Sequence, residues 1–279
     1  DNNIKIVSIS NIELEPYFLR EAEKSFGKYG KNVSVVYLQY EECTEEIYKE
    51  VVKNADTILA ALNFEVLYPD FCNGICAEKY TNEEIKNDAV QKCASLYSYL
   101  KEISTAPVVW LGFEDFCFKY YTVFGSIYFG EGIVDGINLE LNKIINKRDA
   151  LIDLKKLIAR VGTDNAYSSK GKYRWNSPYS RALISLVCGE LAKKHLINNG
   201  ITKKCVVIDC DNVLWGGILS EDGIEGIKLG EGSRHREFQQ FLLTLYYHGV
   251  ILAICSKNDE QDVLRVFREH SGMLLKEEN

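Results

Sequence analysis

Short apolar runs that alternate with segments of helical periodicity constrain the fold of this sequence more than any other feature. Apolar and β-branched residues fill six runs that we expect to be strands: Lys5–Ile9, Val33–Leu38, Thr57–Leu62, Pro107–Leu111, Lys204–Asp209 and Val250–Cys255. Helical patterns occupy residues 16–28, 44–52, 82–102, 149–161, 180–195, 233–247 and 260–269. Strands that alternate with helices in this way predict an α/β fold with mainly parallel sheets and helices on both faces.

Short polar residues mark the starts of two helical patterns. Thr44 and Asp149 precede such patterns, and we expect both to act as N-caps because their side chains can accept hydrogen bonds from free helix amides. Gly162 follows the second of these patterns and is expected to end that helix.

The length of 279 residues exceeds what one small core usually supports, so the sequence predicts two domains. We expect a first α/β domain at residues 1–165, a linker and bridging helix at 166–202, and a second domain at 203–279. The linker is expected because residues 162–180 are polar, although Trp175 and several tyrosines are large for a purely flexible segment. The second domain has about half the usual length of an α/β domain.

Charge and cysteine content limit the classes of function. The net charge of −7 argues against broad nucleic-acid binding, which needs a basic surface to neutralise phosphates. The longest stretch without Asp, Glu, Lys or Arg, at 238–256, is interrupted by polar residues and Gly249, so no membrane span is expected. The nine cysteines are an odd number and no signal-like segment precedes the first strand, so reduced thiols and a cytoplasmic location are predicted.

An acidic motif, Asp209–Gly217, begins where the fifth apolar run ends. Ligands of open α/β sheets bind at the carboxyl ends of strands. Two carboxylates at such a place, Asp209 and Asp211, can divide the work of phosphoryl transfer: one attacks phosphorus and the other protonates the leaving oxygen. Because like charges this close repel, we expect Mg²⁺ to be held by both aspartates, and oxygen ligands suit this ion.

A second polar group ends the sixth apolar run. A hydroxyl, neighbouring backbone amides and a lysine can together hold phosphoryl oxygens. Since an acidic pair ends one strand and a serine ends the following one, we interpret the two groups as one phosphate site rather than as solvated turns. The residues expected to bind the substrate phosphate are Ser256, Lys257, Asn258, Asn212, Gly216 and Gly217.

These motifs resemble those of a known enzyme superfamily. Asp209–Val213 is similar to motif I of the haloacid dehalogenase-like (HAD) superfamily, and Ser256 to its motif II. Three longer words, Asp211–Gly217, Ser220–Gly223 and Cys255–Asp259, resemble the FkbH-like branch in particular.

The resemblance implies roles for the two aspartates and a substrate class. Asp209 is implied as the nucleophile and Asp211 as the general acid and base, with Mg²⁺ on the Asp209 carboxylate and the Asp211 carbonyl. FkbH-like proteins take 1,3-bisphosphoglycerate, remove its phosphate and deliver the glyceryl unit to the phosphopantetheine thiol of an acyl carrier protein in polyketide and related pathways. The expected function is therefore glyceryl transfer, with a small phosphorylated metabolite and a carrier protein as partners.

Cys210, between the two aspartates, has two interpretations. A nearby cation would lower the pKa of its thiol, and the thiolate could then carry the acyl group as a thioester. Alternatively, Cys210 is a small buried residue that fills a gap in the core. Cys205 and Cys255 lie inside apolar runs and are expected to pack in the core.

Two departures from the family pattern leave other functions open. The family's motif III lysine and terminal acidic pair are expected near where this sequence stops, and no residue after Ser256 supplies them. We therefore interpret the second domain as an incomplete HAD-like Rossmannoid domain, truncated before motifs III and IV. Whether such a chain is active stays open. The alternatives are an Mg²⁺-dependent HAD phosphatase that acts on another small phosphorylated metabolite, and a non-catalytic module that binds a carrier protein.

The amino-terminal region resembles the SGNH-hydrolase type of flavodoxin-like fold, which FkbH-like proteins carry. A working hydrolase of that type needs a Gly-Asp-Ser nucleophile block and a late Asp-x-x-His, and neither is present. Asn63, after the third apolar run, is the only echo of its active site. We expect this domain to be a scaffold or a platform for the carrier protein rather than a catalyst.

Overall fold

The structure is a computed structural model that describes residues 2–72, 80–115 and 132–279. The chain forms two compact units, Asp1–Gly200 and Ile201–Asn279, and each is described by itself. Both units contain only parallel strand pairs among the described residues, so the predicted α/β fold with parallel sheets is confirmed.

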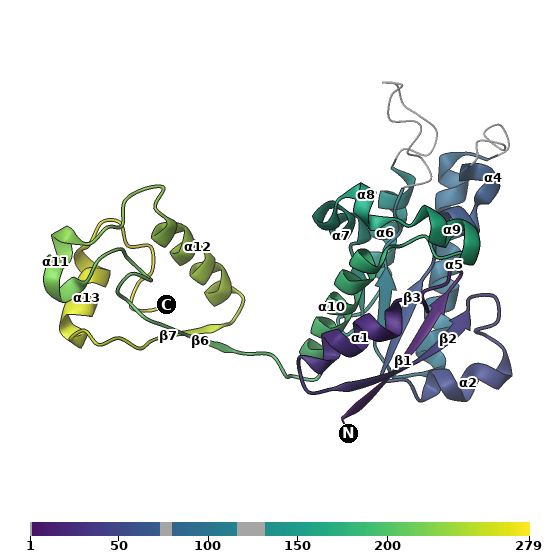
Figure 1. The fold of residues 1–279 in the computed structure, drawn as a ribbon, viewed down its shortest axis with the longest axis horizontal. Helices are drawn as coiled ribbons and strands as arrows, with labels where there is room; N and C mark the ends of the chain where they lie inside the picture. Colours follow the sequence, from purple (N-terminus) through teal and green to yellow (C-terminus); the bar gives the residue numbers. More distant parts are fainter. Residues whose placement is uncertain (1, 73–79, 116–131) are drawn as a thin grey trace. The chain divides into compact units, whose positions relative to one another are not determined.

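The first unit is built on a five-stranded sheet (Figure 1). Its strands are β1 (Asn3–Ser10), β2 (Asn32–Gln39), β3 (Thr57–Ala61), β4 (Val108–Leu111) and β5 (Ala150–Ile152). The strand order is β2-β1-β3-β4-β5, the flavodoxin-like order, in which the direction of winding reverses between β1 and β3. Ligands of such sheets bind at the carboxyl ends of the strands beside this reversal.

Helices cover both faces of the five-stranded sheet (Figure 1). One face packs against α1 (Phe18–Gly27), α7 (Leu154–Val161) and α10 (Arg181–Asn198). The other packs against α2 (Glu46–Lys53), α5 (Asn82–Ile103) and α6 (Ile133–Ile144). Successive residues of a strand point to opposite faces, so Ile58 joins one core and Leu59 the other, and both are fully buried. The short helices are α3 (Phe64–Leu67), α4 (Pro69–Cys72), α8 (Thr163–Ala166) and α9 (Ser169–Trp175).

The prediction of a helix at residues 149–161 is wrong for residues 149–153. Residues Ala150–Ile152 form the edge strand β5, which pairs with β4, and the helix α7 begins only at Leu154. Asp149 is not an N-cap: its buried carboxylate accepts hydrogen bonds from the Tyr97 hydroxyl at 2.6 Å and the Val108 amide at 2.7 Å. Pairing with a neighbouring strand therefore overrides the local helical pattern.

Capping also differs from the expectation at two helices. Asp153 caps α7 by accepting a hydrogen bond from the Lys156 amide. At α2 the N-cap is Glu45, without a side-chain hydrogen bond, so Thr44 does not cap that helix. The helix α6, which the sequence patterns did not predict, completes the face that also holds α5.

The segment expected as a linker and bridging helix belongs mostly to the first unit. Helix α10 buries Leu183, Val187 and Leu191 in the same core as α1, and the boundary between the units falls after Gly200. Apolar residues at helical spacing on α10 explain this, because they need a partner surface to leave water.

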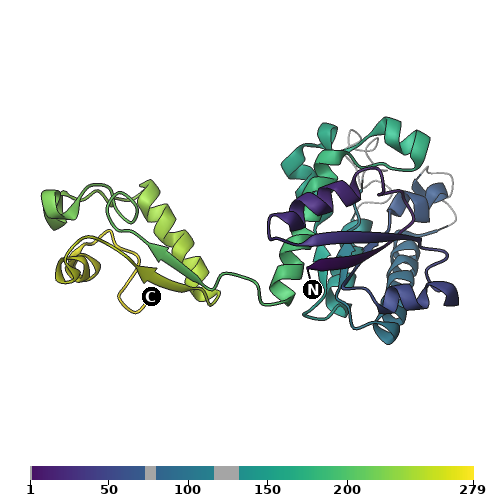
Figure 2. The ribbon, with the colours of Figure 1, turned by 60° about the horizontal axis from the view of Figure 1, so that its bottom comes forward.

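The second unit is smaller and contains a parallel pair of strands, β6 (Cys205–Ile208) and β7 (Ile251–Ile254). Its helices are α11 (Leu219–Gly226), α12 (Arg234–Tyr247) and α13 (Glu260–Glu269). The chain runs from β6 through α11 and α12 to β7, and α12 lies beside β7 (Figure 2). Trp215 is fully buried in the core that these helices form on one face of the pair.

The other face of the β6–β7 pair is exposed. Val206 and Leu252 pack against the core, whereas the alternate residues Val207 and Ile251 are 65% and 63% exposed. Cys205 is exposed as well, and so is Cys255 after β7, so the expectation that both pack in a core is wrong. The reason is that the helices cover one face of this pair, whereas parallel sheets are usually covered on both.

The cysteines and helices of the described residues bear on two further expectations. All seven cysteines in the described ranges are free thiols. None of the described helices has the length and apolar character to span a bilayer.

Candidate functional site

The carboxyl ends of β6 and β7 meet at one edge of the second unit. Ile208 and Ile254 are register partners, and the Cys255 amide donates to the Ile208 carbonyl at 2.9 Å. The chain beyond this pair carries the acidic motif on one side and Ser256 on the other. Cys210 directly follows Asp209 and Ser256 directly follows Cys255, so the paired strand ends bring both motifs to one edge.

The carboxylate of Asp211 is held in place by two donors. Its Oδ1 accepts hydrogen bonds from the indole Nε1 of Trp215 and from the Leu219 amide, both at 3.1 Å. The indole belongs to a fully buried ring, so this carboxylate oxygen is fixed to the core of the unit. No described residue donates to the second oxygen, Oδ2, so this oxygen can carry a proton.

Asp209 is more open than Asp211. It directly follows β6 and is exposed, and its Oδ1 accepts a hydrogen bond from the Cys210 amide at 2.7 Å. An exposed carboxylate that projects from the end of a strand is accessible to a substrate, as a nucleophile must be.

The glycines of the acidic motif serve the turn itself. The Gly217 amide donates to Asn212 Oδ1 at 3.1 Å, and the Gly216 amide donates to the Lys228 carbonyl at 3.0 Å. Asn212 has φ 58° and Gly217 φ 106°, so both lie in the left-handed region. Because these amides are already paired, they do not offer the free donors that phosphate binding by Gly216 and Gly217 requires.

The polar group after β7 forms a compact turn. The Ser256 Oγ accepts hydrogen bonds from the Asn258 amide at 3.3 Å and from its side-chain Nδ2 at 3.2 Å. Lys257, between them, is exposed. The turn thus presents one hydroxyl next to Cys210 and one cation toward solvent.

Cys210 lies in the core of the second unit. It is fully buried, and burial raises the pKa of its thiol to about 11, with the neighbouring aspartates adding to the rise and Ser256 opposing it. A buried thiol of this kind is inert as a nucleophile, so the geometry favours the packing interpretation.

Two buried side chains of α12 contact the acidic motif, and the sequence reasoning missed their role. His235 Nδ1 lies 3.0 Å from the Val213 carbonyl, and Gln239 Nε2 donates to the Leu214 carbonyl at 2.8 Å. The signal in the sequence was a polar pair four residues apart, on the helix face that also buries Leu242.

The edge of the second unit fits a magnesium ion in its donor chemistry. Asp209 offers a carboxylate oxygen and Asp211 a main-chain carbonyl, and Mg²⁺ in proteins is often held by one or two carboxylates with water in most remaining positions. In the described ranges no three His, Cys, Asp or Glu side chains gather into a metal cluster. The two aspartates alone would therefore leave most coordination positions of such an ion to water or another ligand.

The carboxyl edge of the first unit holds a buried polar network. Asn63, after β3, donates to Tyr179 Oη at 3.2 Å and, more weakly, to Glu114 Oε1 at 3.5 Å. Asn11, after β1, accepts from the Asn63 amide at 2.7 Å, and Tyr167 donates to Glu114 Oε2 at 2.8 Å. Burial raises the pKa of Tyr179, and the negative charge of Glu114 adds to this, so its hydroxyl stays protonated as a donor.

Among the described residues of this network, no nucleophile is paired with a base. The Ser10 hydroxyl donates to the Ile12 carbonyl at 2.6 Å. His195, the only histidine of the first unit, lies against Thr57 at the opposite, amino end of β3. The polar side chains at this edge thus hold the strand ends together, and none of the described residues there is placed as a catalytic nucleophile.

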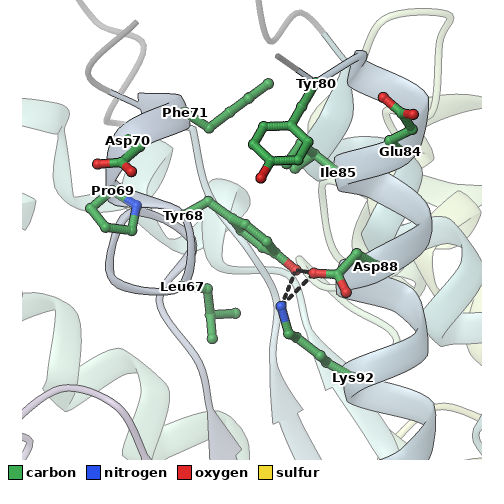
Figure 3. A pocket seen from close by; sticks show the side chains of 10 residues that line it. All are labelled: Leu67, Tyr68, Pro69, Asp70, Phe71, Tyr80, Glu84, Ile85, Asp88 and Lys92. Carbon is green, nitrogen blue, oxygen red and sulfur yellow. Dashed lines mark hydrogen bonds and ion pairs between the residues drawn. The ribbon is translucent and has the colours of Figure 1, made fainter. Parts of the chain in front are cut away.

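A hollow of about 510 Å³ lies between α4 and α5 of the first unit (Figure 3). In it the Tyr68 hydroxyl donates to Asp88 Oδ2 at 2.7 Å, and Lys92 forms an ion pair with the same carboxylate. Burial raises the pKa of Tyr68, and the hydrogen bond with Asp88 adds to the rise. The hydroxyl and the ammonium group are thus both engaged with one carboxylate.

The fold and the site together define an α/β chain with parallel sheets and a paired-aspartate motif at the sheet edge of its second unit. Among solved structures it is similar to the N-terminal part of the protein BF1531 from Bacteroides fragilis, described as containing a phosphatase domain complexed with Mg. The TM-score is 0.75 at 19% identity, over 98% of this chain and 74% of that chain. At this identity the likeness shows a shared fold.

A weaker likeness relates part of the chain to the lipase Lip_vut3 from a goat rumen metagenome. It has a TM-score of 0.48 and 17% identity, and covers 70% of this chain and 97% of that chain. A score this low carries no argument for the first unit. No family model matches the chain, and no curated protein matches it either.

Proposed function

We propose that the second unit is the catalytic unit of an Mg²⁺-dependent phosphatase of the HAD type that acts on a small phosphorylated metabolite. The observation that carries the proposal is the meeting of Asp209, Asp211 and Ser256 at the joined ends of two parallel strands. The similar fold of a bacterial chain with a phosphatase domain complexed with Mg supports it.

The proposed reaction uses the two aspartates in turn. The exposed Asp209 carboxylate attacks phosphorus, the bond from phosphorus to the leaving oxygen breaks, and Asp211 Oδ2 gives that oxygen its proton. Asp211, now ionised, takes a proton from water, which attacks the acyl phosphate on Asp209 and releases phosphate. Asp211 Oδ1, held by Trp215 and Leu219, fixes the orientation of the group throughout.

Mg²⁺, held by Asp209 and Asp211, would neutralise part of the charge on the phosphoryl group. Ser256 and Lys257 support the same task from the other strand, through a hydroxyl and an exposed cation at the shared edge.

The test is phosphate release from a panel of phosphorylated metabolites, with and without Mg²⁺. Asp209→Asn should abolish turnover, and Asp211→Asn should lower kcat by at least about 100-fold because general acid–base catalysis is lost. Glu225→Gln, which changes an exposed carboxylate elsewhere in the unit, is the matched control and should leave kcat unchanged. Mg²⁺-independent turnover, or full activity of Asp209→Asn, would refute the proposal.

The finer proposal is that the phosphate is that of 1,3-bisphosphoglycerate and that the glyceryl unit passes to the phosphopantetheine thiol of an acyl carrier protein. The longer sequence words that resemble the FkbH-like branch support it. Since the Cys210 side chain is fully buried, we propose transfer without a Cys210 thioester.

Mass spectrometry of the chain with 1,3-bisphosphoglycerate and a carrier protein tests this finer proposal. A glyceryl adduct on the carrier, formed equally by the Cys210→Ala variant, is expected. Phosphate release that is unchanged by the carrier and leaves no adduct would favour the plain phosphatase. Absence of both activities would favour a non-catalytic module that binds a carrier protein.

A further inference from the structure

Helix α12 carries two polar side chains at positions where burial is complete or nearly so. His235 is 8% exposed, and Gln239, one turn later on the same face, is 0% exposed. Burying a polar group costs free energy unless its hydrogen bonds are made, so a leucine would satisfy packing at such positions more simply. The partners of these two side chains therefore indicate what they do.

The loop that carries Asp211 needs donors from outside itself. The amides of Val213 and Leu214 both donate to the Cys210 carbonyl, at 3.2 and 2.9 Å, so the loop closes on itself through its N–H groups. The carbonyls of Val213 and Leu214 accept from α12 instead. His235 Nδ1 lies 3.0 Å from the first, and Gln239 Nε2 donates to the second at 2.8 Å.

Gln239 also fastens a second segment. Its Oε1 accepts hydrogen bonds from the Leu274 amide at 2.8 Å and the Leu275 amide at 3.3 Å, and its Nε2 lies 3.3 Å from Met273 Sδ. One amide side chain thus uses its donor on the acidic loop and its acceptor on residues 274–275. The two halves of its function can be separated by mutation.

The imidazole of His235 also limits the space under the acidic loop. A Cβ on Gly216 would lie 3.2 Å from Nε2 of His235, so the ring packs tightly against this glycine. Arg234 Nε donates to the same Nε2 at 3.4 Å, which leaves Nδ1 as the protonated nitrogen that donates to Val213.

We propose that His235 and Gln239 are positioning residues that hold the Cys210–Trp215 loop in the conformation that places the Asp211 carboxylate at the sheet edge. The link runs through Trp215, whose backbone follows Leu214 directly and whose indole donates to Asp211 Oδ1. Loss of either donor on α12 releases a loop carbonyl and lets the indole and the carboxylate move together. The catalytic part of this inference rests on the proposed phosphatase function, whereas the link from α12 to Trp215 does not.

The experiment uses the full chain labelled with 5-fluorotryptophan, with the position-215 resonance assigned by its loss in Trp215→Phe. Gln239→Met removes both halves of the amide, and Gln239→Glu at pH 8 keeps the acceptor for residues 274–275 but loses the donor. His235→Asn keeps an N–H at the δ position and His235→Leu does not. Gln240→Met and Gln240→Glu, at the exposed neighbouring position, are the matched controls.

Without metal, the Gln239 variants and His235→Leu should shift or broaden the fluorine resonance of position 215, whereas the Gln240 variants should leave it unchanged. His235→Asn, which keeps the δ N–H, should shift it less than His235→Leu does. With Mg²⁺ and substrate, kcat should fall about 10- to 100-fold in the Gln239 variants and in His235→Leu, with KM within about threefold, as expected when outer residues orient a catalytic group. Near-ultraviolet circular dichroism identifies the variants that keep their fold. If Gln239→Met unfolds, Gln239→Glu provides the measurement at this position.

A wild-type fluorine resonance and a wild-type kcat in folded Gln239→Glu would overturn the proposal. So would equal effects of His235→Asn and His235→Leu, because the argument depends on the δ N–H. If the wild-type chain releases no phosphate, the proposed function fails while the metal-free spectra still decide whether α12 positions the loop.

Discussion

The indole nitrogen of Trp215 lies 3.1 Å from Asp211 Oδ1 and donates a hydrogen bond to it. The ring is fully buried, so a side chain of the hydrophobic core fixes one oxygen of a carboxylate at the sheet edge. This places the orientation of the proposed acid and base under the control of core packing.

Replacing this indole should weaken both folding and catalysis. Trp215→Phe removes the donor and leaves a gap in the core, so the free energy of unfolding should fall by about 2 kcal/mol. Because Asp211 keeps only the Leu219 amide, kcat of the proposed phosphatase should fall about 10- to 100-fold. Chemical denaturation and phosphate release measure the two effects. Trp175→Phe, at a side chain that is 51% exposed, serves as the control and should change neither by much.

The buried carboxylate of Asp149 should matter more for stability than a helix cap would. It accepts hydrogen bonds from Tyr97 and Val108 and pairs with Lys101 at 3.3 Å. Asp149→Ala should lower the free energy of unfolding by about 3 kcal/mol, because it leaves the Tyr97 hydroxyl, the Val108 amide and the Lys101 ammonium group without their acceptor.

The neighbouring capping residue gives the matched comparison. Asp153→Ala, which removes the N-cap of α7, should cost about 1 kcal/mol in urea denaturation. Equal costs for the two substitutions would contradict the structural role assigned to Asp149.

His195 should make the first unit less stable in mild acid. Burial lowers the pKa of His195 below its usual 6.5, and its ring lies 3.2 Å from the Thr57 hydroxyl. His195 therefore binds a proton more readily in the unfolded chain than in the folded one. The contribution of neutral His195 to the free energy of unfolding is fully present above pH 6.5 and is lost as the pH falls toward the folded-state pKa. The slope is at most about 1.4 kcal/mol per pH unit.

Urea midpoints at pH 7.5 and 5.5 measure this effect. His195→Gln should flatten the dependence on pH, whereas His248→Gln, at an exposed histidine, should keep the wild-type slope. A slope that is the same in His195→Gln and wild type would assign the acid sensitivity to carboxylates instead.

The cysteines should differ sharply in alkylation rate. Cys205 and Cys255 are exposed, whereas Cys93 and Cys210 are buried, and burial raises the pKa of their thiols to about 12 and about 11. At pH 8 the two buried thiols should react at least about tenfold more slowly with iodoacetamide. Peptide mapping by mass spectrometry follows each site. If Cys210 reacted as fast as Cys205, its thiol would be accessible and the thioester interpretation would regain support.

Much of the fold could be predicted because the spacing and number of apolar residues distinguish its strands from its helices. The run Thr57–Leu62 is apolar throughout, as suits a strand buried on both faces, and β3 occupies Thr57–Ala61. The short edge strand β5 could not be predicted, because Leu151 and Leu154 continue a helical spacing and only pairing with β4 makes Ala150–Ile152 a strand.

The sequence predicted where the aspartates and the serine of the candidate site lie, but not the hydrogen bonds that hold their loops in place. Asp209 and Ser256 each follow an apolar run, so their shared edge follows from the parallel pairing of neighbouring strands. The engagement of the Gly216 and Gly217 amides depends on partners such as Lys228, which no local pattern specifies. The same holds for Gln239, whose partners lie 25 and 35 residues away.

The polar network at the carboxyl edge of the first unit also constrains how that unit comes apart. Tyr167 and Tyr179 both donate to the carboxylate of Glu114, so the chain around α8 and α9 cannot peel away from β4 without breaking bonds to a buried charge. Amide protons across residues 163–180 should therefore exchange with solvent at rates similar to those of the sheet, because both open in one cooperative step and residues 163–180 do not unfold separately.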